Sequence, residues 1–176
     1  MRLGVLCSGN GTNFENIVKN CPDHEVVLMI YNKKKCGAKK RADKLDIPNC
    51  HIRHKDEDNM IILFETYKVD FIILAGYMKI LSTKFIEAFP NKIINIHPSL
   101  LPKYKGLNAI EQAFNSDDIL TGCTVHYVTE ELDSGTIIGQ ETVPILPNDT
   151  LEVLTERVHK AEHFLLPQVI NHAIIN

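Results

Sequence analysis

Apolar and polar positions along this chain form short blocks that predict strands alternating with helices. Short continuous apolar runs are typical of buried strands, and apolar residues that recur every three or four positions are typical of one helix face. The predicted strands cover residues 3–7, 26–31, 49–53, 71–75 and 93–97. The predicted helices cover residues 14–19, 38–45 and 58–67, and a fourth runs from its N-cap Ser82 to residue 88.

The second part of the chain has a different pattern. A helix is predicted over residues 109–114, followed by strands over residues 121–128 and 136–143. A long helix then begins at Asp149 or Thr150 and reaches about residue 173. Because strands that alternate with helices form a mostly parallel sheet, the sequence predicts an α/β, Rossmann-like fold with helices flanking the sheet. The C-terminal part is expected to add an antiparallel strand and the long helix.

Length and charge narrow the class of protein. The 176 residues favour a single domain, 1–176, that is large enough to bury a sizeable core. The net charge of −3 gives no general reason to expect nucleic acid or a membrane as a partner. We expect a cytoplasmic protein, because no stretch resembles a signal peptide or reaches the length of a membrane span.

Two compositional features qualify this picture. The five cysteines are widely spaced and include no Cys-x-x-Cys pair, which predicts free thiols in a reducing compartment. Cys7 ends the first strand and is expected in the core. The basic stretch formed by residues 33–35 and 39–41 is interpreted as a solvated loop and helix start. A basic rim that attracts anionic substrates is the alternative.

A glycine-containing loop directly follows the first predicted strand. Residues 8–13 read Ser-Gly-Asn-Gly-Thr-Asn. A strand, such a loop and a helix together present backbone N–H groups to a phosphate. The loop only partly matches the common glycine-rich phosphate motifs, so a plain turn between strand and helix remains the alternative. The phosphate interpretation divides the domain into a phosphate-binding half, about 1–97, and a C-terminal half, about 98–176.

Two polar residues lie at the end of the fifth predicted strand. Asn95 and His97 alternate with Ile94 and Ile96, so their side chains point to one face, and Pro98 stops the strand. The Asn95 amide can hold a developing oxyanion, and the His97 imidazole can give or take a proton near neutral pH. The alternative is that both side chains only cap turns.

Asp133 lies in the turn between the last two predicted strands. A carboxylate that folds back to His97 would orient the imidazole and favour its protonated form. The alternative is that Asp133, Ser134 and Gly135 simply form the turn. His126 lies within an apolar strand and is interpreted as a buried core histidine.

The long C-terminal helix carries the sequence His159-Lys160-Ala161-Glu162-His163, which matches a zinc-peptidase pattern. His159 and His163 share one helix face, so a zinc site is geometrically possible. A pattern of five residues is, however, easily met by chance.

Four stretches together resemble the glycinamide ribonucleotide formyltransferases, a family of folate-dependent enzymes of purine synthesis. They are residues 8–13, 74–81, 95–102 and 131–135, and the resemblance covers almost the whole chain. The third and fourth stretches are shared with other enzymes that use 10-formyltetrahydrofolate, so they indicate the chemistry. The first stretch and the His159–Glu162–His163 motif are typical of the ribonucleotide transferase. The resemblance therefore replaces the zinc interpretation of that motif with a substrate-binding one.

The resemblance implies the formyltransferase fold and a role for each stretch. The implied catalytic residues are Asn95, His97 and Asp133. The implied substrate-binding residues are Gly11, Thr12, Asn13, Pro98, His159 and Glu162. The residues implied to bind the folate, largely through backbone groups, are Met78, Lys79, Ile80, Leu81, Asn95, Thr129, Glu130, Glu131, Leu132 and Asp133.

By the same resemblance, the formyl group of 10-formyltetrahydrofolate, a co-substrate, passes to the primary amine of the ribonucleotide. The amine attacks directly, and neither a metal nor a covalent intermediate is expected. The partners are then small molecules, and the protein is expected to be a monomer or a homodimer. The alternatives are a formyltetrahydrofolate hydrolase, another formyltransferase such as the one that acts on methionyl-tRNA, and a non-catalytic nucleotide-binding module.

The sequence departs from the family pattern in a few places. Lys79 stands where arginine is frequent, and Asn108 stands where histidine is common. Residues 55–60 offer no arginine for the glutamate tail of the folate. We also expect a shorter C-terminus than in many relatives, since the chain ends at Asn176.

Overall fold

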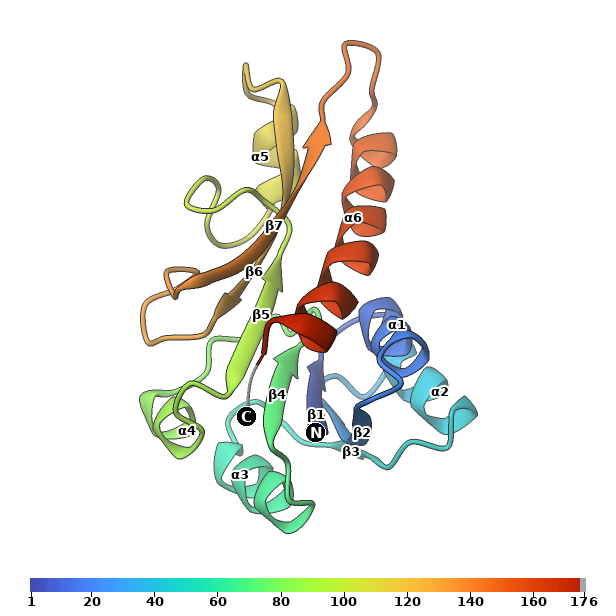
Figure 1. Cartoon of the computed structure of the whole chain (residues 1–176), viewed down its shortest axis with the longest axis vertical. Coiled ribbons are helices and arrows are strands. Elements are labelled where there is room, and N and C mark those ends of the chain that lie inside the picture. Colours follow the sequence, from blue (N-terminus) through green and yellow to red (C-terminus); the bar gives the residue numbers. More distant parts are fainter. Residues whose placement is uncertain (175–176) are drawn as a thin grey trace.

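The computed structural model describes residues 1–174. Its centre is a seven-stranded sheet (Figure 1). Its strands lie in the order β3-β2-β1-β4-β5-β6-β7. Their bounds are β1 (Arg2–Cys7), β2 (Glu25–Tyr31), β3 (Asn49–His51), β4 (Phe71–Leu74), β5 (Ile93–His97), β6 (Leu120–Tyr127) and β7 (Ile137–Pro144).

The sheet is parallel from β3 to β5 and antiparallel at β6 and β7. Parallel neighbours need a connection that returns the chain to the same end of the sheet, and helices provide it here. This arrangement confirms the predicted mostly parallel sheet with antiparallel strands in the C-terminal part. The helices before β6 are α1 (Thr12–Asn20), α2 (Gly37–Lys44), α3 (Glu57–Thr66), α4 (Thr83–Ala88) and α5 (Ala109–Phe114).

The order of the strands creates a ligand-binding crevice. β2 and β3 lie on one side of β1, whereas β4 and β5 lie on its other side. The side on which successive strands are added to the sheet thus changes between β1 and β4, which run parallel. Sheets of this α/β type bind ligands beyond the carboxyl ends of the strands at such a point. Residues 8–13 follow β1 and residues 75–81 follow β4, so both predicted binding loops lie at this crevice.

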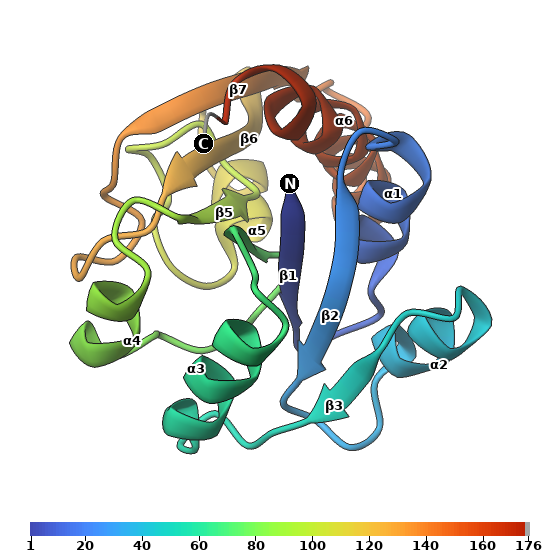
Figure 2. The same ribbon diagram turned by 60° about the horizontal axis from the view of Figure 1, so that its bottom comes forward.

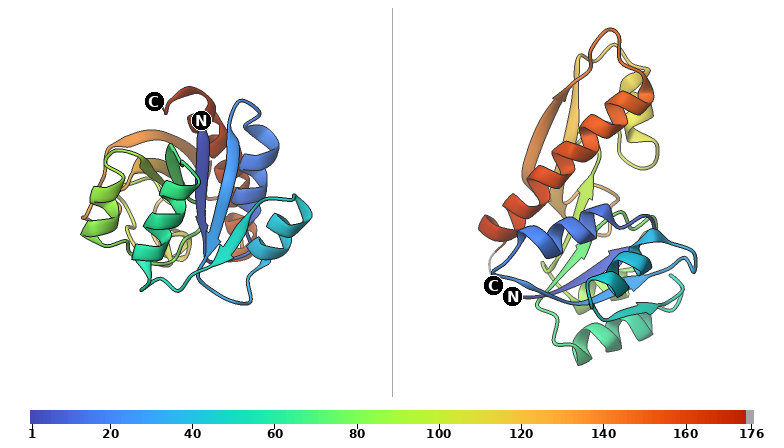
Figure 3. Two further views of the ribbon diagram at one scale, coloured as in Figure 1. Left: turned by 90° about the horizontal axis from the view of Figure 1, so that it is seen from below. Right: turned by 90° about the vertical axis from the view of Figure 1, so that its right-hand side faces the viewer.

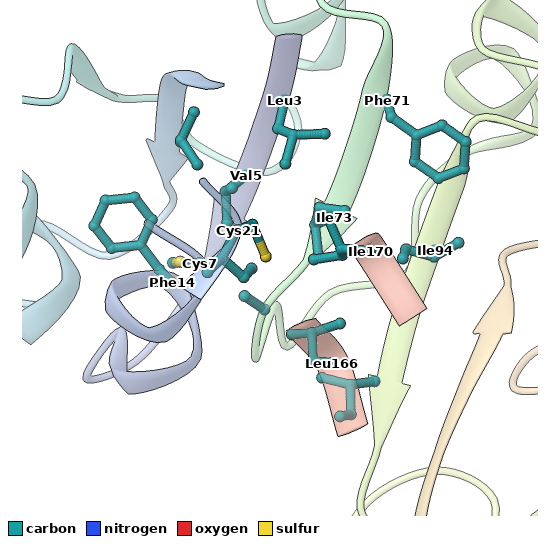
Figure 4. Packing of buried hydrophobic residues seen from close by; sticks show 14 of the residues in the cluster. Leu3, Val5, Cys7, Phe14, Cys21, Phe71, Ile73, Ile94, Leu166 and Ile170 are labelled. Atoms are coloured by element: carbon teal, nitrogen blue, oxygen red, sulfur yellow. The ribbon is translucent and has the colours of Figure 1, made fainter. Parts of the chain in front are cut away.

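Two hydrophobic clusters cover the two faces of the sheet. Figure 2 shows α1, α2 and α6 (Leu151–His172) on one face and α3 and α4 on the other, and Figure 3 repeats this from below. Ile170 of α6 and Ile73 of β4 belong to the first cluster (Figure 4). Phe64 of α3 and Phe85 of α4 belong to the second, with their rings 6.3 Å apart in an edge-to-face arrangement.

Helix α6 starts where the sequence predicted. The Thr150 side chain caps it by accepting a hydrogen bond from the Val153 N–H, and the helix continues through Pro167 to His172. In the right-hand view of Figure 3, α6 lies along β6 and β7 and extends beyond the parallel part of the sheet. Its central residues His159 and Glu162 can therefore reach the crevice.

Two predicted boundaries were wrong by two residues, whereas several others differ by one. Helix α1 begins at Thr12 rather than at residue 14, because Gly11 adopts a left-handed conformation that ends the loop and starts the helix at once. Strand β3 ends at His51 rather than at residue 53, since its ladder with β2 stops where β2 ends at Tyr31.

All five cysteines are free thiols, as predicted, and Cys7 is buried in the core. Among residues 1–174, no helix is both long enough and apolar enough to span a membrane. The sheet takes strands from both predicted halves of the chain. The division of the domain at about residue 97 stays a prediction.

Candidate active site

A cavity of about 570 Å³ lies at the carboxyl ends of β1, β4 and β5. Its walls come from the loops that follow these strands, from the turn between β6 and β7, and from α6. Every residue that the sequence analysis assigned to catalysis or binding lines this cavity. These residues are Gly11, Thr12, Asn13, Met78, Lys79, Ile80, Leu81, Asn95, His97, Pro98, Thr129, Glu130, Glu131, Leu132, Asp133, His159 and Glu162.

The loop after β1 presents the first turn of α1 to the cavity. Gly11 is the N-cap of α1 and has a φ of 77°. A Cβ atom on Gly11 would lie 2.6 Å from the Cα atom of Ala38 in α2, so any side chain there would collide with that helix. Among the described residues no side chain caps α1. The backbone N–H groups of its first turn are therefore available to an anion.

A second glycine of this loop is open to the cavity. Gly9 is exposed, and a Cβ atom built on it meets nothing within 4 Å. Its carbonyl accepts a hydrogen bond from the Ala38 N–H at 3.2 Å, which ties the loop to α2. A side chain at Gly9 would therefore obstruct a bound ligand without disturbing the protein.

The basic stretch is a solvated loop and helix start, as predicted. Residues 33–35 are exposed, and α2 begins shortly after them at Gly37. Arg41 of α2 donates from Nε to the Asn10 carbonyl at 2.8 Å and also pairs with Glu15 of α1. A basic rim that attracts anionic substrates stays a prediction.

The loop after β4 forms the apolar wall of the cavity. The Ser8 N–H donates to the Gly76 carbonyl at 3.1 Å, and the Met78 N–H donates to Ser8 Oγ at 2.8 Å, so the two loops are held together. Met78 is 55% exposed and Ile80 is 72% exposed. Apolar side chains on a cavity wall suit an apolar part of a ligand.

Asn95 and His97 both point toward the cavity, as predicted from their alternation along β5. His97 Nε2 lies 2.8 Å from the Tyr104 carbonyl oxygen, and Nδ1 lies 3.4 Å from Asp133 Oδ2. A carbonyl can only accept, so Nε2 carries a proton. The ring can donate to Asp133 as well only when a second proton sits on Nδ1. The geometry therefore places Nε2 against a carbonyl and Nδ1 against the Asp133 carboxylate.

Asp133 folds back to the end of β5, which the functional interpretation of its turn required. Its φ is 48°, a left-handed conformation that aspartate tolerates better than most residues. Its Oδ2 also accepts a hydrogen bond from the Gly106 N–H at 2.8 Å. The Asp133 side chain is only 7% exposed, so its charge acts in a poorly solvated site.

His126 is a site residue that the sequence analysis missed. It is buried, as predicted, but its Nε2 lies 3.3 Å from Asn95 Nδ2 and 3.7 Å from Asp133 Oδ1. Burial is the main cause that lowers its pKa, with the Tyr127 carbonyl and Asp133 opposing it, so the ring is neutral at neutral pH. Nδ1 lies 2.9 Å from the Tyr127 carbonyl and must carry the proton, which leaves Nε2 to accept from Asn95.

His126 thus orients the Asn95 amide. The two residues are direct partners in the antiparallel ladder between β5 and β6. A polar residue within an apolar strand was the only signal in the sequence, and it does not reveal which residue lies opposite.

The three side chains of the His159–Glu162–His163 motif on α6 do not all face the cavity. His159 and Glu162 line the cavity, whereas His163 lies outside its lining and its carbonyl accepts a hydrogen bond from Asn16 Nδ2 at 2.7 Å. Within residues 1–174, no group of three or more His, Cys, Asp or Glu side chains is arranged to hold a metal ion.

Glu162 is a buried carboxyl group on the cavity wall. It is 6% exposed, and Asn13 Nδ2 donates to its Oε2 at 3.3 Å. Burial raises the pKa of Glu162 to about 7, against the smaller opposing effect of Asn13. The group can therefore exchange a proton near neutral pH.

We expect Glu162→Gln to stabilise the folded protein at pH 8 and to change its stability little at pH 4. The pKa rises from 4.5 to about 7 on folding, so the folded state binds this proton more tightly than the unfolded state. The stability that this tighter proton binding contributes is fully present below pH 4.5 and is lost as the pH rises through 7. A neutral amide at this position avoids that loss. The gain at pH 8 is about 1–3 kcal/mol. Urea unfolding at both pH values measures it, and an equal effect at pH 4 and pH 8 would contradict the assignment.

Both substitutions that depart from the family pattern lie on the cavity wall. Lys79 is exposed on the β4 loop. Asn108 is the N-cap of α5 with a φ of 57°, beside the exposed Leu107, and both also line the cavity. Residues 55–60 lead into α3 and do not line the cavity.

Comparisons with known proteins agree with this geometry. Residues 1–170 match the family model described as Formyl transferase. The chain is 42% identical over 182 aligned positions to the trifunctional purine biosynthetic protein adenosine-3 of Drosophila pseudoobscura pseudoobscura, which covers 96% of this chain and 13% of that protein. The protein of the same name from Homo sapiens is 38% identical over 180 positions, covering 96% of this chain and 18% of that protein. The chain therefore spans less than a fifth of these relatives.

Solved structures of shorter proteins match over nearly their whole length. The phosphoribosylglycinamide formyltransferase of Anaplasma phagocytophilum has a TM-score of 0.95 and 40% identity, covering 97% of this chain and 85% of that one. The enzyme of the same name from Bacillus halodurans has a TM-score of 0.92 and 38% identity, covering 97% and 94%.

Proposed function

This chain belongs to the formyl transferase family, and from that membership we propose that it transfers a formyl group from 10-formyltetrahydrofolate to the amine of glycinamide ribonucleotide in purine biosynthesis. The observation that carries the proposal is the convergence of Asn95, His97 and Asp133 in one cavity. That cavity lies between a glycine-containing loop at a helix N-terminus and an apolar loop. A phosphate and a pterin ring need these two kinds of surface.

The two substrates approach the catalytic residues from opposite sides. The phosphate of the ribonucleotide binds the N–H groups at Gly11, Thr12 and Asn13, where the positive end of α1 favours an anion. The pterin lies against residues 78–81 and 129–133. His159 and Glu162 contact the ribose or glycinamide part of the ribonucleotide. The amine and the formyl group then meet beside Asn95 and His97.

Bond formation places a negative charge on the formyl oxygen. The neutral amine attacks the formyl carbon, and the electrons of the C=O bond move to oxygen. The Asn95 amide, held by His126, donates a hydrogen bond to this oxyanion, and protonated His97 beside it stabilises it through its charge. Donors that are already in place stabilise such a charge strongly, and removal of one typically costs about 10²–10³ in turnover.

Collapse of the intermediate requires one proton to move. The electrons return to carbon, the bond to folate N10 breaks, and N10 gains a proton while the amine loses one. His97, or a water held by Asp133, carries this proton. Pro98 follows His97 directly and helps to position the substrate. Alignment of two bound substrates supplies a further large part of the rate.

An acceptor comparison tests the proposed function. The purified protein is given 10-formyltetrahydrofolate with glycinamide ribonucleotide, with charged methionyl-tRNA, or with water alone. We expect formyl transfer to the ribonucleotide and neither of the other products at a comparable rate. Hydrolysis without an acceptor would instead indicate a formyltetrahydrofolate hydrolase, and binding of both substrates without turnover would indicate a nucleotide-binding module. A cytoplasmic location and assembly as a monomer or homodimer stay predictions.

A further inference from the structure

The loop between β5 and α5 holds both members of the His97–Asp133 pair. The Tyr104 carbonyl lies 2.8 Å from His97 Nε2, and the Gly106 N–H donates to Asp133 Oδ2 at 2.8 Å. The relative position of imidazole and carboxylate therefore depends on where this loop places one carbonyl and one N–H group.

The backbone of this loop requires outside support. Tyr104, Gly106 and Asn108 have φ values of 55°, 80° and 57°, all in the left-handed region. Residues other than glycine adopt this region rarely, and such conformations persist only when surrounding contacts fix them. Tyr104 therefore depends on contacts that hold its backbone in this region.

Asp118 provides two of these contacts. Its Oδ2 accepts a hydrogen bond from the Tyr104 hydroxyl at 2.7 Å, and Lys103 Nζ lies 2.8 Å and 2.9 Å from its two oxygens. The Asp118 N–H donates to Ser116 Oγ at 3.1 Å, which holds it in the turn after α5. Neither Asp118 nor Tyr104 lines the cavity, so within the described part of the chain they lie behind the site rather than in it.

We propose that Asp118 is a positioning residue for His97 in the reaction proposed above. It holds Lys103 and Tyr104 so that the Tyr104 carbonyl receives the Nε2 proton of His97. Nε2 is then fixed as the nitrogen that donates to this carbonyl, and Nδ1 is left facing Asp133. Without this anchor the loop relaxes, and the ring loses its fixed orientation while the walls formed by residues 8–13, 78–81 and 129–133 remain.

Four variants separate positioning from general stability. Asp118→Ala removes both contacts, Tyr104→Phe removes only the hydroxyl contact, and Asp118→Glu restores the charge. Asp117→Asn is the matched control, because Asp117 is exposed and makes no ion pair or side-chain hydrogen bond with the described residues. We expect kcat to fall about tenfold or more in Asp118→Ala, since small misplacements of a catalytic group are costly. The Michaelis constants should change far less, Asp118→Glu should recover part of the loss, and Asp117→Asn should match wild type.

Nitrogen NMR of the imidazole makes the test independent of activity. In wild type, the His97 Nε2 proton is expected to exchange slowly, and Asp118→Ala and Tyr104→Phe should speed its exchange and shift both ring nitrogens. Unchanged His97 signals in these folded variants would overturn the proposal, whatever happens to kcat. Tyr104→Phe decides the matter if Asp118→Ala does not fold. A wild-type protein without formyl transfer would overturn the proposed function alone, because the His97 signals still test the positioning.

Discussion

His97→Ala is expected to lower kcat by about 10²–10⁴-fold while the protein stays folded. The imidazole is proposed both to stabilise the oxyanion through its charge and to carry the proton between amine and N10, and alanine can do neither. His97 is buried at the end of β5, next to the ligand cavity, so the smaller side chain enlarges a space that already exists. The matched control is His172→Ala, because His172 is exposed near the end of α6 and does not line the cavity.

Asp133→Asn is expected to cause a loss of similar size. Asparagine tolerates the φ of 48° at this position, so the variant removes the charge without straining the turn. In the wild type, His97 Nδ1 lies 3.4 Å from the Asp133 carboxylate oxygen. The neutral amide of the variant cannot replace the charge of this carboxylate. The imidazole then loses the carboxylate that faces Nδ1 and orients the ring.

The double variant distinguishes a cooperating pair from two separate contributions. Residues that act as one unit are not additive, so the loss in His97→Ala/Asp133→Asn should be far smaller than the product of the two single losses. Single-turnover and steady-state kinetics, with circular dichroism as the check on folding, measure all three variants. Near-normal turnover in either single variant would rule out its proposed role.

Gly9→Val is expected to raise the Michaelis constant for the ribonucleotide by about tenfold or more and to leave folate binding almost unchanged. A side chain at Gly9 enters open space beside the proposed phosphate site, so it obstructs the ligand rather than the protein. Loss of remote binding energy should also lower kcat somewhat, because that energy helps to position the amine.

Gly11→Val provides the contrast. The φ of 77° and the contact with Ala38 mean that a side chain there strains the loop and displaces α2, at a cost of about 1–3 kcal/mol or more in stability. The Gly11→Val variant would therefore weaken binding and folding together. Separate titration of each substrate, with a thermal melt of every variant, distinguishes a loss of binding from a loss of stability. Equal weakening of ribonucleotide and folate binding in a stable Gly9→Val protein would contradict the proposed location of the phosphate.

Much of the fold could be predicted because the signals are local. A buried strand such as Phe71–Leu74 needs a continuous apolar run, and a helix such as α4 needs a cap such as Ser82, whose side chain accepts from the Phe85 N–H. The errors at α1 and β3 arose where the end of an element depends on a neighbour or on one glycine, which periodicity does not show.

The residue types and spacing by themselves placed Asn95 and His97 in the candidate site, but they did not reveal His126. The alternation of Asn95 and His97 on one strand placed both on one face, and the motifs that carry the family resemblance supplied the rest. Only the tertiary structure decided how those side chains meet: that Asp133 folds back to His97, that His126 faces Asn95 across two antiparallel strands, and that Asp118 supports Tyr104 behind the site. Contacts between residues far apart in the chain depend on strand register and on left-handed turns, and these are fixed by the packing of the whole sheet rather than by any local pattern.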